Sequence, residues 1–545
     1  MLHKPRFLKN HAKKYVALGL MSLMPLVATA ESALVIGSRL ELLVDDALIE
    51  RLEGVSFKLH PPKPAEVSLA FDQPWEGSGN HYLTVLKEDD RYRMYYHSVA
   101  GKKASVGGED WESYVCYAES KDGIAWTRPK LGLYEFHGSK ENNIVHPAYS
   151  LRPGKGGGWP ADGRFPEPNG ILHPSVNLRP GAPPEQRYLS LCAHQYFDAN
   201  ADGKTTSHQA GETENNWAFR VYLFASPDGL HWKRLSDDPI VEWSYKPGTA
   251  WKGTYYKPTN LSDNAETIFW DESLKKYVVY IRDMRIAPGT GQHIRGVRRA
   301  TSPDLKQWSY LEWIHLNPLN TDEFYTYGPR PYFRAPHILF SFPMRIVLNR
   351  RADFLPAEYD AVRGKGVTDT VFMSSRDGLH WDRRFLESFI RPGLDKLKWT
   401  DRSNATSQGL VPTGPQEMSV YVIEYFRLPM SQVRRYTMRT DGIASINAPY
   451  AGGELVTKPL IFSGRRLILN AATSAAGGIR VEILDAEGNP IERYTGTNPV
   501  EFFGDDTAYE VRWDQGPDVA ALAGKPVRLR FLMKDADLFS FRFTE

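Results

Sequence analysis

The chain has 545 residues and a formal net charge of +2 at neutral pH, and 41% of its residues are hydrophobic. A net charge this close to zero argues against a protein that binds nucleic acid or an acidic membrane surface. A chain of this length is too long for one ordinary compact core, so we expect one large domain built from repeats and a smaller domain.

The first thirty residues have the composition of a signal peptide. Five Lys and Arg residues precede a mostly apolar run over 15–27, and Ala28-Thr29-Ala30 offers small residues for a signal peptidase. We therefore predict a signal peptide over residues 1–30, cleaved before Glu31, and a secreted or periplasmic protein. A membrane anchor is the alternative, but the apolar run is short for a stable span. No later segment has an uninterrupted apolar run long enough to cross a bilayer.

A short motif recurs along the chain, each time after a strand-like run. Four copies end in tryptophan and a fifth is degenerate: Ser120–Trp126, Ser226–Trp232, Ser302–Trp308, Ser375–Trp381 and Thr440–Ser445. Self-similarity of this kind is typical of repeat architectures. Its Ser and Asp would cap the amides of a tight hairpin, its Gly would supply a positive φ, and its Trp would pack the outer strand against its neighbour.

Two further strand-like runs lie upstream of each copy and a short one follows it, which gives four strands per unit and five units. This pattern predicts an all-β protein whose residues 31–447 form a five-bladed β-propeller. Unrelated hairpins in a sandwich are the alternative. Leu40–Glu50 alternates like a strand, and we expect it to close the ring by joining the last unit. Residues 448–545 hold short alternating strands and predict a C-terminal β-sandwich.

Two features bear on metals and disulfides. Asp198–Gly203 has oxygen ligands at positions 1, 3 and 5 and Gly at 6, as in a calcium loop, but position 12 is Gln209 instead of Glu. We predict a polar insertion loop and no cofactor, with structural calcium as the alternative. Cys116 and Cys192 lie in apolar strand-like runs, which favours two buried thiols over a disulfide.

These repeats and the sandwich after them resemble glycoside hydrolase families 32 and 43, and especially exported bacterial proteins of a family 32-like group. The stretches that carry the resemblance are Leu43-Val-Asp-Asp46, Arg91-Tyr-Arg-Met-Tyr-Tyr96, Arg334-Ala-Pro-His337, Arg434-Arg-Tyr-Thr437 and Gly453-Glu-Leu-Val-Thr-Lys-Pro459. The resemblance implies a carbohydrate-processing propeller. One departure matters, because those families carry an essential Asp at the start of the first blade, whereas Gly77–Tyr82 holds no carboxylate.

The catalytic candidates follow from the predicted architecture, in which the inner strands converge on one axial pocket. Glycoside hydrolysis needs two carboxylates, one protonated and one ionised. We predict Asp263 as base or nucleophile, Glu323 as general acid, and Glu417 as a group that orients substrate or raises its neighbour's pKa. The structural alternatives are a turn cap for Asp263, a solvated loop residue for Glu323 and a partner of an arginine for Glu417. Asp45 and Asp46 are weaker candidates.

The substrate-binding candidates come from the same strand openings: Asn80, His81, His173, Arg282, Tyr325 and Arg334. Arginines also gather near these strands, namely Arg282, Arg298, Arg330, Arg334 and Arg345, and would suit an acidic or sulfated sugar. The alternative is that they neutralise carboxylates of the units. Aromatic rings such as those of Trp75, Trp251, Tyr325 and Tyr327 could stack on sugar rings.

The sequence therefore predicts an exported glycoside hydrolase that acts on a polysaccharide or oligosaccharide, with no nucleic-acid partner and no membrane span. Two alternatives stay open. One is a carbohydrate-binding propeller without catalysis, which the lack of carboxylates at the start of the first two units favours. The other is a sialidase-like or lyase-like enzyme with an aromatic nucleophile or base, for which Tyr325 is the candidate.

Overall fold

The computed structural model describes residues 33–79, 81–100, 112–147, 175–197, 217–236, 239–243, 266–286, 293–319 and 322–545. Nearly all regular structure in these ranges is β, and their one α-helix, α1 (Asp360–Arg363), has four residues. The all-β prediction is therefore confirmed. No helix in these ranges is long and apolar enough to cross a membrane. The predicted signal peptide and the calcium-like loop lie outside the described residues.

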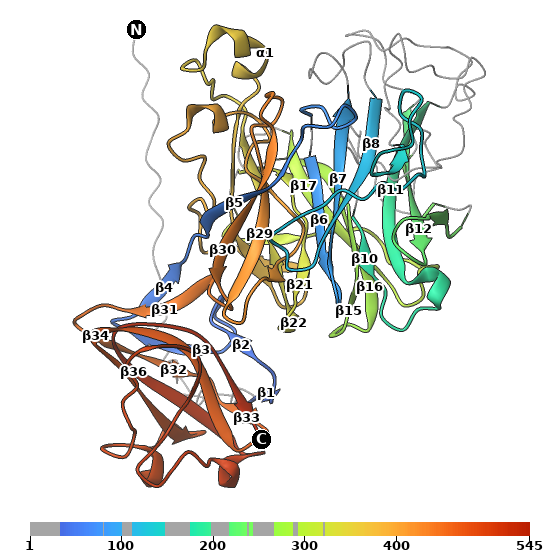
Figure 1. Cartoon of the computed structure of the whole chain (residues 1–545). Helices are drawn as coiled ribbons and strands as arrows, with labels where there is room; N and C mark the ends of the chain where they lie inside the picture. Colours follow the sequence, from blue (N-terminus) through green and yellow to red (C-terminus); the bar gives the residue numbers. More distant parts are fainter. Residues whose placement is uncertain are drawn as a thin grey trace, which may run out of the picture.

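Five units of mainly antiparallel sheet follow one another along the chain (Figure 1). Unit 1 is β6 (His81–Lys87), β7 (Tyr92–Ala100), β8 (Glu112–Ser120) and β9 (Ile144–Pro147). Unit 2 is β10 (Asn177–Leu178), β11 (Tyr188–Phe197), β12 (Trp217–Ser226), β13 (Lys233–Arg234) and β14 (Val241–Trp243). Unit 3 is β15 (Thr267–Asp271), β16 (Lys276–Ile286), β17 (His293–Ser302) and β18 (Glu312–Trp313).

Units 4 and 5 are less regular. Unit 4 has a sheet of β19 (His315–Asn317), β21 (Arg330–Tyr332), β22 (Ala335–Ser341), β25 (Met373–Ser375) and β26 (His380–Asp382), and a second of β20 (Glu323–Thr326), β23 (Met344–Val347) and β24 (Val367–Thr370). Unit 5 is β27 (Ala405–Thr406), β28 (Val411–Pro412), β29 (Glu417–Glu424) and β30 (Gln432–Arg439). Its outer strand is β5 (Lys63–Ala70), from the other end of the chain.

The five units pack in a cyclic order through shared apolar clusters. Side chains of units 1 and 2 form one cluster, those of units 2 and 3 the next, and units 3 and 4 and units 4 and 5 follow in turn. A further cluster joins unit 5 back to unit 1.

Both cysteines are buried free thiols in these sheets, as the sequence favoured.

The recurring turn has the same geometry in its four tryptophan-containing copies. In the first, the Ser120 hydroxyl accepts a hydrogen bond from the Gly123 amide at 2.9 Å. Asp122 Oδ1 accepts from the Ile124 amide at 2.8 Å. The Trp126 indole donates to the Gly123 carbonyl at 3.2 Å, and the other three tryptophans repeat this bond at 3.0–3.2 Å. The motif therefore builds the hairpin that the sequence predicted.

Three of these turns also bind the preceding unit in the cyclic order. A side chain of that unit donates to a turn carbonyl in each case: Tyr421 to Gly123 at 2.5 Å, Arg93 to Asp228 at 2.6 Å and Tyr280 to Gly378 at 2.7 Å. The turn glycines permit this close approach. A Cβ on Gly229 would lie 2.3 Å from the Tyr95 hydroxyl, so no side chain fits there.

The remaining strands form a ten-stranded sheet below the units in Figure 1. It consists of β1 (Leu34–Gly37), β2 (Glu41–Leu42), β3 (Ile49–Glu53), β4 (Ser56–Leu59), β31 (Ala444–Ala448), β32 (Gly453–Thr457), β33 (Leu460–Phe462), β34 (Arg466–Asp485), β35 (Asp505–Glu510) and β36 (Pro526–Thr544). The segment Leu40–Glu50 belongs here, because β2 pairs with β36 and β3 with β32. The expectation that it completes unit 5 was wrong. An alternation of apolar and polar residues identifies a strand but does not determine which strand it pairs with.

A buried ion cluster joins this sheet to unit 4. Glu41 on β2 lies 2.8 Å from Arg376, a residue of the fourth turn, and 3.4 Å from His337. Arg376 also binds Asp45 at 2.8 Å. Burial raises the pKa of Glu41, but hydrogen bonds from His337 and Arg376 and the charges of Arg376 and Arg39 outweigh it and lower that pKa to about 2. Asp45 thus has a structural role.

Glu41→Gln should lower the free energy of unfolding by about 3 kcal/mol at neutral pH, because it leaves Arg376 with a buried charge less well compensated. Since the pKa of Glu41 is lower in the folded than in the unfolded chain, its stabilisation is complete above about pH 4.5 and is lost as the pH falls toward about 2. Urea unfolding of both proteins across this pH range would test it. The exposed Glu487→Gln is the control, and equal stabilities at neutral pH would contradict the role of Glu41.

Gly229→Ala should destabilise the protein more than Gly393→Ala. Both glycines have a similar positive φ, +78° and +80°, but an added Cβ at Gly393 meets nothing within 4 Å. Gly393→Ala therefore measures the backbone cost alone, about 1 kcal/mol. The excess for Gly229→Ala, about 1–3 kcal/mol, measures the close approach of unit 1 to this turn. Thermal unfolding of both variants gives the difference in stability. Equal losses of stability would show that unit 1 does not pack tightly against this turn.

Candidate functional site

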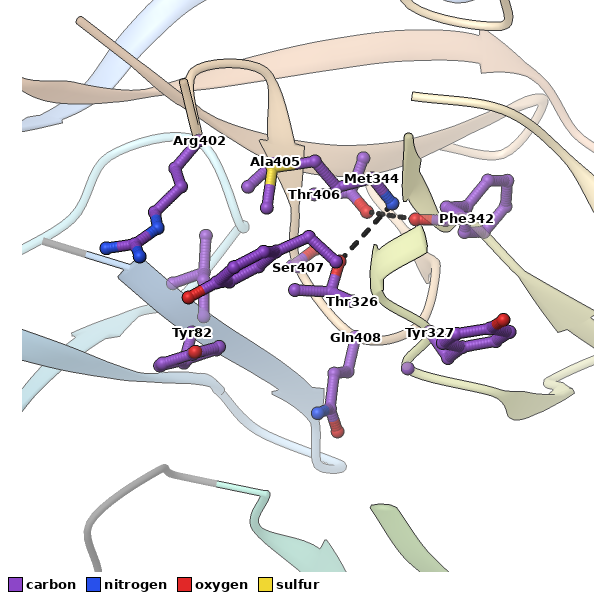
Figure 2. A pocket seen from close by; sticks show the side chains of 13 residues that line it. Tyr82, Thr326, Tyr327, Phe342, Met344, Arg402, Ala405, Thr406, Ser407 and Gln408 are labelled. Atoms are coloured by element: carbon purple, nitrogen blue, oxygen red, sulfur yellow. Dashed lines mark hydrogen bonds between the residues drawn. The ribbon is translucent and has the colours of Figure 1, made fainter. Parts of the chain in front are cut away.

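One pocket of about 490 Å³ is bordered by the start of β6, the end of β20 and the short strand β27 (Figure 2). Its lining comes from units 1, 4 and 5: Tyr82, Leu83, Tyr325, Thr326, Tyr327, Gly328, Phe342, Met344, Arg402, Ala405, Thr406, Ser407 and Gln408. The lining combines aromatic rings with hydroxyl, amide and guanidinium groups and contains no carboxylate. Such a mixture suits a ligand with apolar faces and many hydrogen-bonding groups.

The backbone around the pocket is strained. Tyr82, Arg402 and Asn404 have positive φ angles of 57°, 59° and 67° although none is glycine. Each such residue costs free energy, and this strain tends to gather at functional sites. Asn404 is held by hydrogen bonds from its side chain to the carbonyls of Thr368 and Lys398, both at 3.2 Å. The arrangement aims the Arg402 side chain toward the pocket (Figure 2).

Three guanidinium groups surround the buried ring of Tyr325. Those of Arg402, Arg295 and Arg282 lie 4.7, 5.0 and 5.6 Å from its centre. Glu323, two residues before Tyr325 on β20, forms an ion pair with Arg295. The ring therefore lies in a positive field next to one carboxylate.

One buried carboxyl group, that of Asp401, lies next to a lining residue. Asp401 lies 3.3 Å from Arg427 and 3.8 Å from Arg402, which lines the pocket. Burial raises the pKa of Asp401, and the charges of both arginines lower it less, so the net shift is upward. Burial also raises the pKa of the phenol of Tyr327, which lines the pocket itself.

Arg330, on β21, links four units beside the pocket. It is buried, and its guanidinium donates to the Ile268 carbonyl of unit 3 at 3.2 Å, to the Ser175 hydroxyl before unit 2 at 3.4 Å, and to the Gln408 side-chain oxygen of unit 5. The backbone N–H of Gln408 in turn donates to the Leu83 carbonyl of unit 1 at 2.9 Å. No described residue gives Arg330 an acidic partner, and burial lowers its pKa below the usual value.

Of the three predicted catalytic residues, the structure describes Glu323 and Glu417, and these two lie apart. Asp263 lies outside the described residues. Glu323 lies beside the pocket, next to Tyr325. Glu417 starts β29, whose far end, at Val422 and Ile423, pairs with the pocket strand β27. It forms an ion pair with Arg435 at 2.7 Å, which is the structural alternative that the sequence left open.

The predicted binding residues that the structure describes lie in two places. Arg282 and Tyr325 lie together at the pocket, and His81 begins β6, one residue before Tyr82. Asn80, His173 and the aromatic candidate Trp251 lie outside the described residues. Arg334 lies 3.3 Å from Asp441 of the degenerate fifth turn, away from the pocket lining.

The other arginine candidates divide in the same way. Arg298 pairs with Asp283 and Arg345 with Asp369, at 2.8 and 2.6 Å, so these two neutralise carboxylates. Arg330 does not, because it binds only neutral oxygen atoms in the described part of the chain.

Sequence reasoning missed Tyr82, Arg402 and Gln408. A signal was present, since the polar run 401–409 lies at the start of the fifth unit, around its first strand β27. The described residues contain no group of three potential metal ligands, so they suggest no metal centre.

Comparison with known proteins gives no family for this chain. No family model matches the sequence, and no curated protein matches it. Several solved structures are similar in part. A glycoside hydrolase is 14% identical, with 69% of this chain and 92% of that chain covered and a TM-score of 0.38.

Two further solved structures resemble the chain to a similar degree. One comes from work on the GH130 family of mannoside phosphorylases, which contains glycoside hydrolases that target β-1,2-mannosidic linkages in Candida mannan. It is 15% identical, with coverage of 73% and 96% and a TM-score of 0.36. The other is an N-acetylgalactosamine deacetylase from F. plautii, 12% identical, with coverage of 71% and 96% and the same TM-score. All three scores lie below 0.5, so no activity or residue role is transferred, and the resemblance to families 32 and 43 is not confirmed.

Arg330→Met should lower the free energy of unfolding by about 3 kcal/mol, because it leaves the oxygen atoms of Gln408, Ser175 and Ile268 without their shared donor. Denaturant unfolding measures the loss. Arg512→Met, at an exposed arginine, should change stability by less than about 0.5 kcal/mol. An Arg330→Met variant as stable as the wild type would show that the buried cation is dispensable to the packing of the units.

Proposed function

We propose that the chain is a carbohydrate-active enzyme, a glycoside hydrolase, whose body is a five-bladed β-propeller. The cyclic order of contacts among the units supports the propeller. The observation that carries the function is the composition of the pocket, because tyrosine rings and hydrogen-bonding groups from three units line it, with Glu323 beside it. Export to the periplasm or the medium is part of the proposal and rests on the N-terminal sequence alone.

We infer that Glu323 acts as a base or a nucleophile and not as the general acid that the sequence suggested. What supports this role is its ion pair with Arg295, which occupies the carboxylate with a cation beside the pocket. Hydrolysis then needs a second, protonated carboxyl group on the other side of the scissile bond. Asp263 is the candidate for this second group. It would then act as the general acid, the role that the sequence suggested for Glu323. Glu417 is not included, because of its place on β29.

A second candidate function is cleavage of an acidic sugar by an enzyme of sialidase or lyase type, with Tyr325 as nucleophile or base. The specific observation in its favour is the position of Arg282, Arg295 and Arg402 around that ring. Guanidinium groups bind carboxylate or sulfate groups well and would stabilise a phenolate as it forms.

Glu323→Gln should reduce kcat by about 10²–10⁴-fold on whichever glycoside the wild type cleaves, because the amide cannot accept a proton or attack. Hydrolysis of a panel of chromogenic glycosides and polysaccharides, neutral and acidic, is the measurement. Glu312→Gln, at an exposed glutamate of β18, is the matched control.

Three results would redirect the assignment. Full activity of Glu323→Gln with loss in Tyr325→Phe would favour the second candidate. Loss of activity in Glu417→Gln without loss of stability would return that residue to the site. Binding of sugars without any turnover by the wild type would favour a carbohydrate-binding protein.

A further inference from the structure

The side chain of Gln408 has a fixed orientation. Its Oε1 accepts hydrogen bonds from the Arg330 guanidinium and from the Ser175 hydroxyl, the latter at 3.1 Å. A guanidinium can only donate, so the amide atom that faces it must be the oxygen. The two positions of the amide group are therefore not interchangeable, and the Nε2 group must point to the other side.

The Nε2 group of Gln408 is an unused donor at the pocket. Gln408 is one of the lining residues, and Figure 2 shows its amide below Thr326 and Ser407 with the nitrogen on the side of Tyr82. Nε2 donates to no described residue, and it is not among the fully buried polar atoms that lack a partner. It can therefore meet a ligand in the pocket.

The lining hydroxyls are different, because the protein already uses them. Thr406 donates to the Phe342 carbonyl at 3.2 Å, and the Thr326 hydroxyl accepts from the Met344 amide at 3.3 Å. The Ser407 hydroxyl accepts from the Tyr421 amide at 3.2 Å. Thr406 and Ser407 thus use their donors within the protein, the latter toward the Gly409 carbonyl at 3.5 Å. Thr326 and Gln408 each keep a donor for a ligand, and that of Gln408 belongs to an amide whose orientation Arg330 fixes.

The stem of Gln408 is also held in place. Its backbone amide is bonded to Leu83, and a Cβ on Gly328 would lie 3.1 Å from its Cγ, so the glycine packs directly against the stem. A donor that is fixed before the ligand arrives loses little conformational entropy on binding.

We propose that Gln408 determines specificity by donating a hydrogen bond from Nε2 to an oxygen of the bound sugar, a hydroxyl or a ring oxygen, with Arg330 holding the amide in position. This inference rests on the proposed function, because it takes the ligand to be a carbohydrate. Sites built to hydrogen-bond a substrate group discriminate strongly against ligands that cannot make the bond.

Gln408→Glu is the sharpest test, because glutamate has the same shape. Its carboxylate would keep the acceptor for Arg330 and give the buried cation an acidic partner, so the melting temperature should not fall. On the pocket side, however, an acceptor would replace the donor. Affinity for the sugar should fall at least about tenfold. Gln416→Glu makes the same chemical change at an exposed glutamine and should leave affinity unchanged.

The measurement is isothermal titration with arabinose, galactose, glucose, mannose and xylose, together with glucuronate and galacturonate, on the full chain. A selective loss in Gln408→Glu, at unchanged stability, is the expected result. Equal affinities in the wild type and Gln408→Glu would overturn the role of Gln408 and leave the proposed function intact. Binding without turnover would overturn the hydrolase proposal and leave the role of Gln408 standing. No binding of any of these sugars by the wild type would overturn both.

The role of Arg330 as a positioning residue has its own readout. Arg330→Lys keeps a donor for Gln408 Oε1, whereas Arg330→Met lets the amide turn over. In protein labelled with ¹⁵N-glutamine, the side-chain signal that Gln408→Glu removes should stay single in Arg330→Lys and broaden or double in Arg330→Met. An unchanged single signal in Arg330→Met would show that Arg330 does not orient the amide.

Discussion

The contact between Arg330 and Gln408 is the constraint on which the centre of the molecule depends. A guanidinium buried among neutral oxygen atoms is costly unless each of its hydrogen bonds is made, and here carbonyl, hydroxyl and amide groups from separate units make them. The bonds hold only when the units stand at the right distance from one another. The same contact borders the pocket, so the geometry that closes the core also sets the position of a ligand-facing group.

Farther from the centre, the turn motif gives the units their common spacing. Each copy closes its own hairpin and, in three cases, offers a carbonyl to a tyrosine or arginine of the preceding unit. This explains why the motif recurs at the same place in each unit. A turn that only ended a hairpin could be replaced by many others, but a turn that also receives a neighbouring side chain needs the glycine and the exposed carbonyl.

Much of the fold could be predicted from sequence because local signals repeat. The strand runs, the turns and the change of character after Asn447 are all visible in the amino-acid order. The partner of Leu40–Glu50 was not predictable, because strand pairing across the whole chain depends on which edge is left open. The split of unit 4 into two sheets has no local signal either.

The site was less predictable than the fold for a related reason. Tyr325 and Arg282 were found because they flank predicted strands, and Glu323 because it is acidic at a strand start. Arg402 and Gln408 owe their position to a strained loop, which composition does not reveal. Glu417 has a residue type that fits a catalytic role, but it pairs with Arg435, and the opposite end of its strand is the one that pairs with β27 at the pocket.

The pairing of β5 with β30 has a consequence for synthesis. Ala70 pairs with Gln432 and Lys63 with Thr437. The ribosome therefore synthesises β5 long before β30, and β5 cannot form this pairing until β30 has been made. Contacts of such long sequence separation form slowly and leave intermediates with an open sheet edge. During that interval β30 lacks its outer neighbour, and the nascent chain is exposed to aggregation and to proteases. One late step of folding is therefore the docking of this early strand onto a strand that is made more than 350 residues later.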